Sequence, residues 1–362
     1  MNKKLKNLVK SKNNAWLTYA IVVLAYIIMA SLKAGGALSS KMSGMLVPIC
    51  VYVAMALSLN LTVGIIGELS LGHAGFMAIG AFAGTSLIAV LQYNGMSSAP
   101  ARLIIGMIFA AAITALCGFL IGIPVLRLRG DYLAIVTLAF AQIIKSIITN
   151  IYFGIDEAGL HFSFVEQNFT LSDSGRIIIE GAMGIRSITK ISTFLAGFIL
   201  VMICLIVIFN LMQSRTGRAI MAIRDNRIAA ESVGIPVFKY KITAFTISAA
   251  MAGAAGCLFG NNFSSVVAGK FNIDTSILVL VFVVLGGQGN MLGSIIAATA
   301  LTILPEALRS FSDYRMLVYA IVLIIVMLAT NNPMIKANIQ KITGKAKKNG
   351  GDLAAEGGAQ NE

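Results

Sequence analysis

RTGRAIMAIRDNRIAAESVGIPVFKYK, residues 215–241, is a basic and polar segment that separates two long apolar runs. It carries six Lys or Arg residues and two acidic residues, and six minus two leaves a local charge of +4. In a chain that crosses a membrane, such a segment lies on the cytoplasmic side. Apolar residues recur at the spacing of a single helix face: Ala219, Ile220, Ile223 and Ala230. We therefore predict a short amphipathic helix at the cytoplasmic face, where it can dock a cytoplasmic partner.

The composition indicates an all-α, polytopic membrane protein. Hydrophobic residues make up 57% of the 362 residues and charged residues only 12%, whereas soluble domains carry about 25% charged residues. Runs of roughly 20 apolar residues, each long enough to cross about 30 Å of hydrocarbon, follow one another along the chain. Little of the chain is left for a soluble domain.

About ten transmembrane helices are predicted. We expect spans at 15–32, 44–66, 70–92, 101–126, 131–151, 191–213, 242–262, 275–287, 291–307 and 315–330. The first apolar run is longer than the 7–15 residues of a signal-peptide core, so it is read as a retained span. An even number of spans returns the C-terminus to the side of the N-terminus, which agrees with the lysines at both ends.

The predicted organisation has three parts in the plasma membrane of the cell. Residues 1–14 form a basic cytoplasmic N-terminus, residues 15–333 the transmembrane domain, and residues 334–362 a disordered, basic cytoplasmic tail. An outer loop at 152–190 is mildly acidic, and a cytoplasmic loop occupies 214–241. The net charge of +13 gathers at cytoplasmic flanks, so an anionic membrane surface explains it and nucleic acid is not implied.

Two segments interrupt the helical pattern: GIIGELSLGHAGFMAIGAFAG at 64–84 and LGGQGNMLGS at 285–294. Irregular backbone survives at membrane depth only where it is buried in protein or lines a cavity. Paired broken segments in a transporter point to the substrate path. The candidate pathway residues are Gly67, Ser70, Gly72, His73, Gly75, Gly286, Gly287 and Gly289. A tight turn between helices at the membrane surface is the alternative, above all for 286–290.

Small residues four apart predict close helix packing. The pairs are Gly80 and Gly84, Ala249 and Gly253, Ala252 and Gly256, and Gly256 and Gly260. The four cysteines, at 50, 117, 204 and 257, lie in separate apolar runs and are expected to be free thiols. Ionisable residues in or near spans are few: Glu68, His73, Asp131, Lys145, Glu306 and Arg309.

Enzyme chemistry is not indicated. The sequence has no GxxxxGK[ST] phosphate-binding loop, no CxxC and only two histidines, so no catalytic grouping or metal site is expected. No cofactor is predicted for this chain. If ATP drives the protein, another chain binds it.

Four ordered blocks resemble the permease subunits of branched-chain amino-acid ABC importers of the LivM-like kind. They contain GELSLGHAGFMAIGAF, RLRGDYLAIVTLAFAQI, GRAIMAIRDNRIAAESVGIPVFKYKITAFTISAAMAGAAG and VLGGQGNMLGSIIAA. The resemblance runs in order over most of residues 44–333. Residues 153–164, FGIDEAGLHFSF, depart from the glycine-rich stretch that many relatives carry there.

The resemblance implies an assembly in which two related permeases pair, each docked on a cytoplasmic ABC ATPase. An extracytoplasmic binding protein would deliver leucine, isoleucine or valine. The segment at 218–234 resembles the cytoplasmic coupling helix of such permeases. The implied ATPase-coupling residues are Arg218, Arg224, Arg227, Ala229, Ala230, Glu231 and Gly234.

The expected mechanism is alternating access driven by the partner ATPases around a largely apolar path. Relatives also carry urea or short amides, so the ligand stays open between these and branched-chain amino acids. A self-contained secondary transporter or channel is the second hypothesis, and it predicts transport without partners. A membrane-embedded enzyme is the third hypothesis. It requires a cluster of polar catalytic residues, which this chain lacks.

Overall fold

The computed structural model describes residues 3–36, 39–128, 130–157, 159–166 and 175–308, together with 321 and 324, and describes side chains from residue 16 onward. Residues 1–303 form one compact unit and residues 304–362 a second. The predicted tail at 334–362 and Arg309 lie outside the described residues, as does the predicted tenth span at 315–330 apart from residues 321 and 324.

Long apolar helices dominate the described chain. Eight of them are long and apolar enough to cross a membrane, and a ninth, Met291–Ala307, is apolar but shorter. This confirms the predicted polytopic helical class. The helices are α1 (Lys3–Ala34), α2 (Ser40–Asn60), α3 (His73–Tyr93), α4 (Ala99–Val125), α5 (Asp131–Thr149), α6 (Phe194–Gln213), α9 (Val237–Gly260), α10 (Ile273–Gly286) and α11 (Met291–Ala307).

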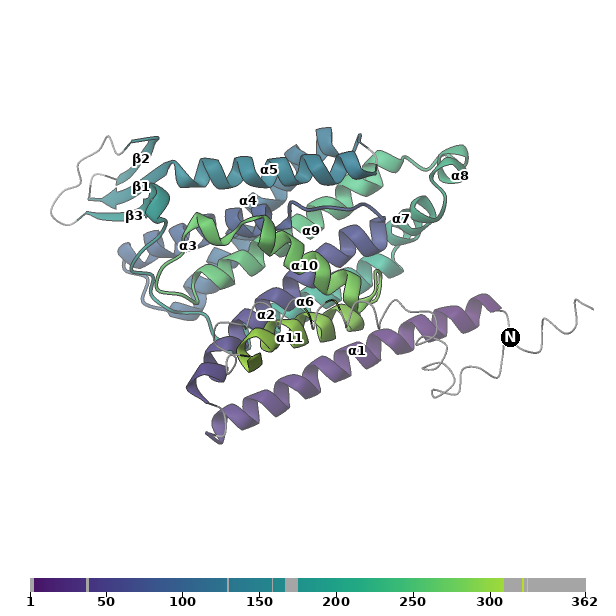
Figure 1. Ribbon diagram of the computed structural model, residues 1–362, viewed down its shortest axis with the longest axis horizontal. Coiled ribbons are helices and arrows are strands. Elements are labelled where there is room, and N and C mark those ends of the chain that lie inside the picture. The colour runs from purple at the N-terminus through teal and green to yellow at the C-terminus, as the bar shows by residue number, and fades with distance from the viewer. Residues whose placement is uncertain are drawn as a thin grey trace, which may run out of the picture. The chain divides into compact units, whose positions relative to one another are not determined.

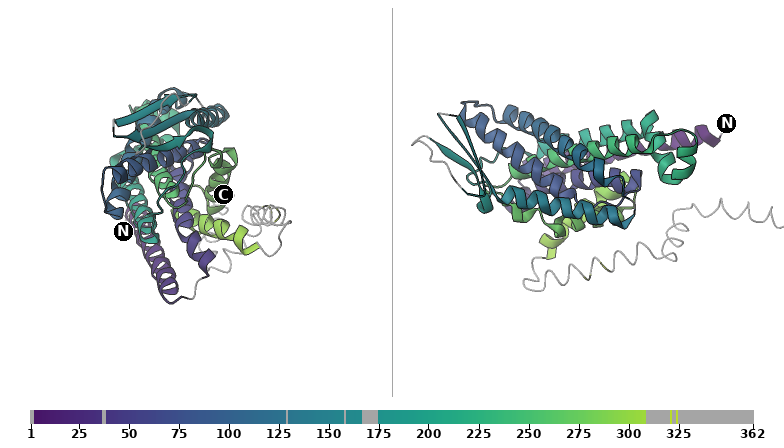
Figure 2. Two further views of the ribbon diagram at one scale, coloured as in Figure 1. Left: turned by 90° about the vertical axis from the view of Figure 1, so that its left-hand side faces the viewer. Right: turned by 90° about the horizontal axis from the view of Figure 1, so that it is seen from above.

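The remaining elements gather at the two ends of the helices. A sheet of β1 (Ile151–Asp156), β2 (Gly159–Phe164) and β3 (Arg176–Glu180) follows α5, and two short helices, α7 (Arg215–Asp225) and α8 (Arg227–Ser232), join α6 to α9. Figures 1 and 2 show the sheet and the α7–α8 pair at opposite ends of these helices. The predicted outer loop and the predicted cytoplasmic loop therefore lie on opposite sides.

Helix α9 is the centre of the packing and touches α2, α3, α4 and α6. Its glycines allow the closest approaches. A Cβ atom on Gly80 of α3 would collide with the backbone of Gly253, and one on Gly256 would collide with the backbone carbonyl of Met77. Backbones that approach this closely gain van der Waals contact, which drives helix association in lipid. The predicted role of the small-residue repeats in internal packing is confirmed.

The three-stranded antiparallel sheet was not predicted. Its strand order is β2-β1-β3, and Phe153 pairs with Phe162 in the β1–β2 hairpin. Side chains alternate along β2, so Leu160, Phe162 and Phe164 are exposed while the residues between them are half-buried. This period of two is the signature of a strand, and the hairpin accounts for the departing stretch at 153–164.

Two helices begin well before their predicted spans, and the first is α1, which begins at Lys3 instead of residue 15. Helix α9 begins at Val237 instead of residue 242, directly after Pro236 at the N-cap. Proline is favoured at helix starts because its missing N–H is not needed there. The two lysines at 239 and 241 are therefore helical, and they belong to the first turns of α9 rather than to a loop.

Substitution at Gly80 tests the packing of α3 on α9. We expect Gly80→Ala to lower the thermal unfolding midpoint of the purified protein, because overpacking against a backbone costs about 1–3 kcal/mol or more. Gly44→Ala is the matched control, since nothing lies within 4 Å of a Cβ at this helical position. Alanine is favoured over glycine in a helix, so the control should be neutral or stabilising. Equal effects of the two substitutions would contradict the packing argument.

Candidate functional site

The first break in the helical pattern begins as a π-helix. Helix α2 continues into η1 (Leu61–Ile66), and Gly67 ends it in the left-handed conformation at φ +81°. Residues 68–72 are not helical, and α3 begins at His73. π-Helical turns inside longer helices are frequent at functional sites.

The non-helical segment runs deep among the helices. The side chain of Ser70 is fully buried and that of His73 is almost so. Two backbone N–H groups donate to hydroxyls of neighbouring helices, each at 3.1 Å: Leu71 of this segment to Thr137 Oγ1 of α5, and Ala74 in the first turn of α3 to Ser276 Oγ of α10. The irregular backbone is thus buried and bonded within the protein, as membrane depth requires.

Ser248, halfway along α9, joins three elements through one hydroxyl. It donates to the carbonyl of Ser58 at 2.6 Å and accepts from Thr62 Oγ1 at 2.9 Å. His73 Nε2 lies 3.1 Å from the same oxygen. A hydroxyl has a single proton to donate, so Ser248 accepts from His73 as well, and this assigns the proton of the neutral ring to Nε2. His73 Nδ1 has no hydrogen-bond partner among the described residues.

The second break lies between α10 and α11 and contacts the first. Gly287 and Gly289 both have positive φ angles, at +90° and +83°. The Asn60 side chain at the start of the π-helix accepts from Gly289 N at 2.8 Å and donates to Ser294 Oγ at 2.9 Å. Asn60 Nδ2 also lies 3.2 Å from the Asn290 carbonyl. One amide therefore ties together two segments that are about 230 residues apart.

Several candidate pathway residues serve close packing in this conformation. A Cβ on Gly72 would meet the carbonyl group of Thr137, and one on Gly75 would stand 2.9 Å from Ala141 Cα. Gly286 packs in the same way against Gly293. The structure brings the two predicted groups of pathway residues to neighbouring segments. It buries Ser70, Gly72, His73 and Gly75, and leaves Gly67, Gly286, Gly287 and Gly289 at least partly exposed.

The predicted single amphipathic helix at the cytoplasmic loop consists of two helices. Asn226, with φ −154° and ψ 105°, ends α7 and caps α8 by accepting from Ala229 N at 3.0 Å. An N-cap asparagine requires this extended backbone, which interrupts the helix. The predicted apolar stripe is therefore shared between two helices. Ile220 and Ile223 are buried on the inner face of α7, and Ala230 is buried on the inner face of α8.

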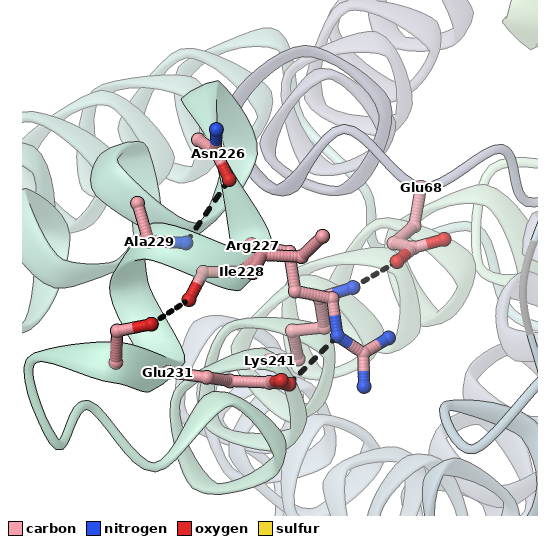
Figure 3. Close-up of polar contacts among 8 residues, drawn as sticks. Glu68, Asn226, Arg227, Ile228, Ala229, Glu231 and Lys241 are labelled. Carbon is pink, nitrogen blue, oxygen red and sulfur yellow. Dashed lines mark hydrogen bonds and ion pairs between the residues drawn. The ribbon is translucent and has the colours of Figure 1, made fainter.

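The outer surface of α8 is exposed and partly apolar. Ile228 is 77% exposed and Val233 is 75% exposed. Arg227 and Glu231 form an ion pair along the helix at 2.9 Å, which Figure 3 shows as a dashed line between the two side chains. Among the predicted coupling residues, the exposed ones are Arg218, Arg224, Ala229, Glu231 and Gly234. Exposed apolar side chains on a short helix at the end of a membrane domain are typical of a protein-docking surface.

Two cationic side chains connect this end of the molecule to the first break. Arg224 Nη1 of α7 donates to the Gly64 carbonyl in the π-helix. Lys241 Nζ of α9 pairs with Glu68 Oε1, and both of these side chains are nearly buried. Figure 3 shows Glu68 and Lys241 pointing toward one another.

Most of these contact residues were not predicted as site residues. They are Asn60, Thr62, Thr137, Ser248, Ser276, Ser294 and Lys241. Each of the first six is a polar residue within an apolar run, and such residues commonly pair with one another inside a membrane domain. The sequence shows this signal, but it does not show which of them meet.

Comparison with known proteins gives one consistent family. Residues 41–327 match the family described as branched-chain amino acid transport system, permease component. The high-affinity branched-chain amino acid transport system permease proteins LivM of Salmonella typhimurium and Escherichia coli are 36% identical over 310 residues, which is 82% of this chain and 71% of each relative. A probable LivM of Methanocaldococcus jannaschii is 24% identical over 67% of this chain and 74% of its own. No solved structure matches the chain.

Replacement of Asn60 tests the link between the two breaks. We expect Asn60→Ala to destabilise the protein by about 1–3 kcal/mol, because the buried Ser294 hydroxyl and the half-buried N–H of Gly289 both lose their partner. Asn150→Ala is the control, since its amide donates only to the Ser146 carbonyl of its own helix in an exposed bond. Thermal unfolding in detergent measures both variants. A loss for Asn60→Ala no larger than that for Asn150→Ala would show that the link adds nothing.

Proposed function

The chain belongs to the branched-chain amino acid transport permease family, and we propose on that premise that it carries leucine, isoleucine and valine into the cell. As a permease component of an ABC transport system it is a non-enzymatic, multi-pass membrane subunit that works with ATPase and binding-protein partners. The observation that carries the proposal is the α7–α8 segment. It presents exposed side chains away from the helices and bonds to a broken membrane helix on its other side.

The proposed assembly contains this chain, a second related permease, two cytoplasmic ABC ATPases and an extracytoplasmic binding protein. ATP binds to the partner ATPases, because the sequence has no phosphate-binding loop of its own. Both termini and the loop at 214–241 face the cytoplasm in this proposal. The basic charge of the loop supports that orientation.

The proposed transport cycle is alternating access at the two breaks. The pathway residues are Gly67, Ser70, Gly72, His73, Gly75, Gly286, Gly287 and Gly289. The burial of four of them supports a closed conformation, in which the path is shut by helix packing. Opening would separate the glycine contacts of α3 with α5 and of α10 with α11. Discrimination among ligands rests mainly with the external binding protein, because the proposed pathway residues include no Asp, Glu, Lys or Arg to hold an amino-acid zwitterion.

The proposed ATPase-docking surface is centred on α8. It combines the exposed apolar side chains of Ile228 and Val233 with Arg218, Arg227, Ala229, Glu231 and Gly234. Ala230 supports this surface from below, because it packs with Ile223 and Val237. Protein interfaces commonly have apolar anchor residues at their centre and polar or charged residues around them.

Uptake into proteoliposomes tests the function directly. We expect radiolabelled leucine to accumulate only when this chain is reconstituted with its partner permease, ATPases and binding protein, and with ATP on the ATPase side. Radiolabelled urea in parallel vesicles tests the ligand class. Urea uptake in place of leucine would assign a short-amide permease. Leucine uptake by this chain alone would assign a self-contained carrier.

A charge placed on α8 tests the docking surface. We expect Ile228→Asp to reduce co-purification of the ATPases at least tenfold, because a carboxylate would be desolvated in an apolar contact. Leu160→Asp is the matched control: Leu160 is also exposed, at 61%, but lies on the sheet at the opposite end. Normal co-purification of the ATPases by the Ile228 variant would exclude α8 as the docking surface.

A further inference from the structure

The α7–α8 segment and the start of α9 form one small packed body. Ile223 of α7, Ala230 of α8 and Val237 of α9 are buried against one another, and Ile235 and Tyr240 pack around them. Packed side chains resist independent movement. A force applied to the exposed surface of α8 therefore moves the start of α9 with it.

Arg224 attaches this body to the end of the first broken helix. The helix formed by α2 and η1 ends at Ile66, so the Gly64 carbonyl lies among its last four carbonyls, which lack helical N–H partners. Arg224 Nη1 donates to this carbonyl. A cation at a helix C-terminus also meets the negative end of the helix dipole. Arg224 is therefore a C-terminal cap supplied by another element.

The same side chain reaches the second break. The aliphatic stem of Arg224 covers Gly67, where a Cβ would stand 3.1 Å from Arg224 Cγ. A Cβ on Gly289 would stand 3.4 Å from Arg224 Nη1. Since Asn60 also bonds to Gly289, the guanidinium lies where the π-helix and the α10–α11 turn meet.

The Glu68–Lys241 ion pair is a second attachment, and Glu68 lies four residues after Gly64 along the chain. It links the non-helical segment to α9, and its side chains are only 12% and 7% exposed. Removing one partner of a buried pair leaves an uncompensated charge, so such pairs hold their elements in register. Arg224 therefore bonds to the chain before Gly67, at the Gly64 carbonyl, and Lys241 bonds to it after Gly67, at Glu68.

We propose that Arg224 and the Glu68–Lys241 pair are positioning residues that carry movement of the coupling segment to the two helix breaks. This rests on the proposed function and deepens it, because it separates two roles within one segment. Exposed residues of α8 bind the ATPases. Arg224, although it lies in the same basic segment, acts on the permease itself and is not needed for docking.

The test uses Arg224→Ala in the full assembly in proteoliposomes, with three readouts: co-purification of the ATPases, ATP hydrolysis, and leucine imported per ATP hydrolysed. We expect normal co-purification, continued hydrolysis and at least a tenfold fall in leucine per ATP. Arg215→Ala is the matched control, because it removes an exposed arginine from the same helix that is not part of the proposed docking surface. It should leave all three readouts within about twofold of the unsubstituted assembly.

A charge swap tests the second attachment. Glu68→Lys or Lys241→Glu alone places like charges together and should lower leucine per ATP, and the double swap should restore at least half of the loss. Loss of the ATPases from the Arg224→Ala assembly, or an unchanged leucine-to-ATP ratio, would overturn the proposal.

A distance measurement separates failure of this proposal from failure of the proposed function. Spin labels at Gln288→Cys, in the second break, and Ile104→Cys, on the exposed surface of α4, report movement without any transport. Cys117, the half-buried native thiol, is replaced by serine, and the other three cysteines are buried. ATP with vanadate should change this distance in the assembly that carries Arg224, and leave it unchanged in Arg224→Ala. Equal changes in both would overturn the proposal even if leucine proves not to be the ligand.

Discussion

The chain between Ser70 and Ala74 packs against α5 and α10, and the rest of the structure depends on how its peptide groups are bonded. Backbone at membrane depth has no water to bond, so an interruption of a helix is stable only where neighbouring elements supply partners. Thr137 of α5 and Ser276 of α10 supply them for the start of α3. These bonds bring α5 and α10 to the break, which becomes a point where membrane helices from both halves of the chain meet.

Close packing and hydrogen bonding act together at this point. Glycines let the backbones of α3 and α9, and of α10 and α11, come into direct contact. The same closeness allows short side chains such as Ser248 and Asn60 to bridge elements that are far apart in sequence. In the proposed cycle, many small contacts keep the path closed, and each of them is weak enough to separate. A protein that alternates between two states needs helices that associate tightly in each state through contacts that are individually weak.

The coupling end shows how one short segment can have two surfaces with different roles. The outward surface of α8 is exposed to solvent. Its inner residue, Ala230, is packed against α7 and α9. Arg224 and Lys241 extend from this packed body to the π-helix and to Glu68. Cationic side chains suit this position because the C-terminal carbonyls of the broken helix and the Glu68 carboxylate are both negative. The segment thus joins the proposed docking surface to the site where the helices are interrupted.

The sequence by itself determined the helical membrane class, the positions of most spans, the two breaks and the basic loop. These follow from local quantities, such as run length, glycine content and charge, that each stretch carries within itself. It also determined the family through four ordered blocks, which the match over residues 41–327 confirms. Only the tertiary structure decided that Asn226 divides the coupling helix, that three strands at 151–156, 159–164 and 176–180 form a sheet, and that Asn60, Ser248 and Arg224 reach particular partners. A hydrogen bond between residues about 230 positions apart depends on how helices pack, and a pattern read along one segment contains no information about its neighbour in space.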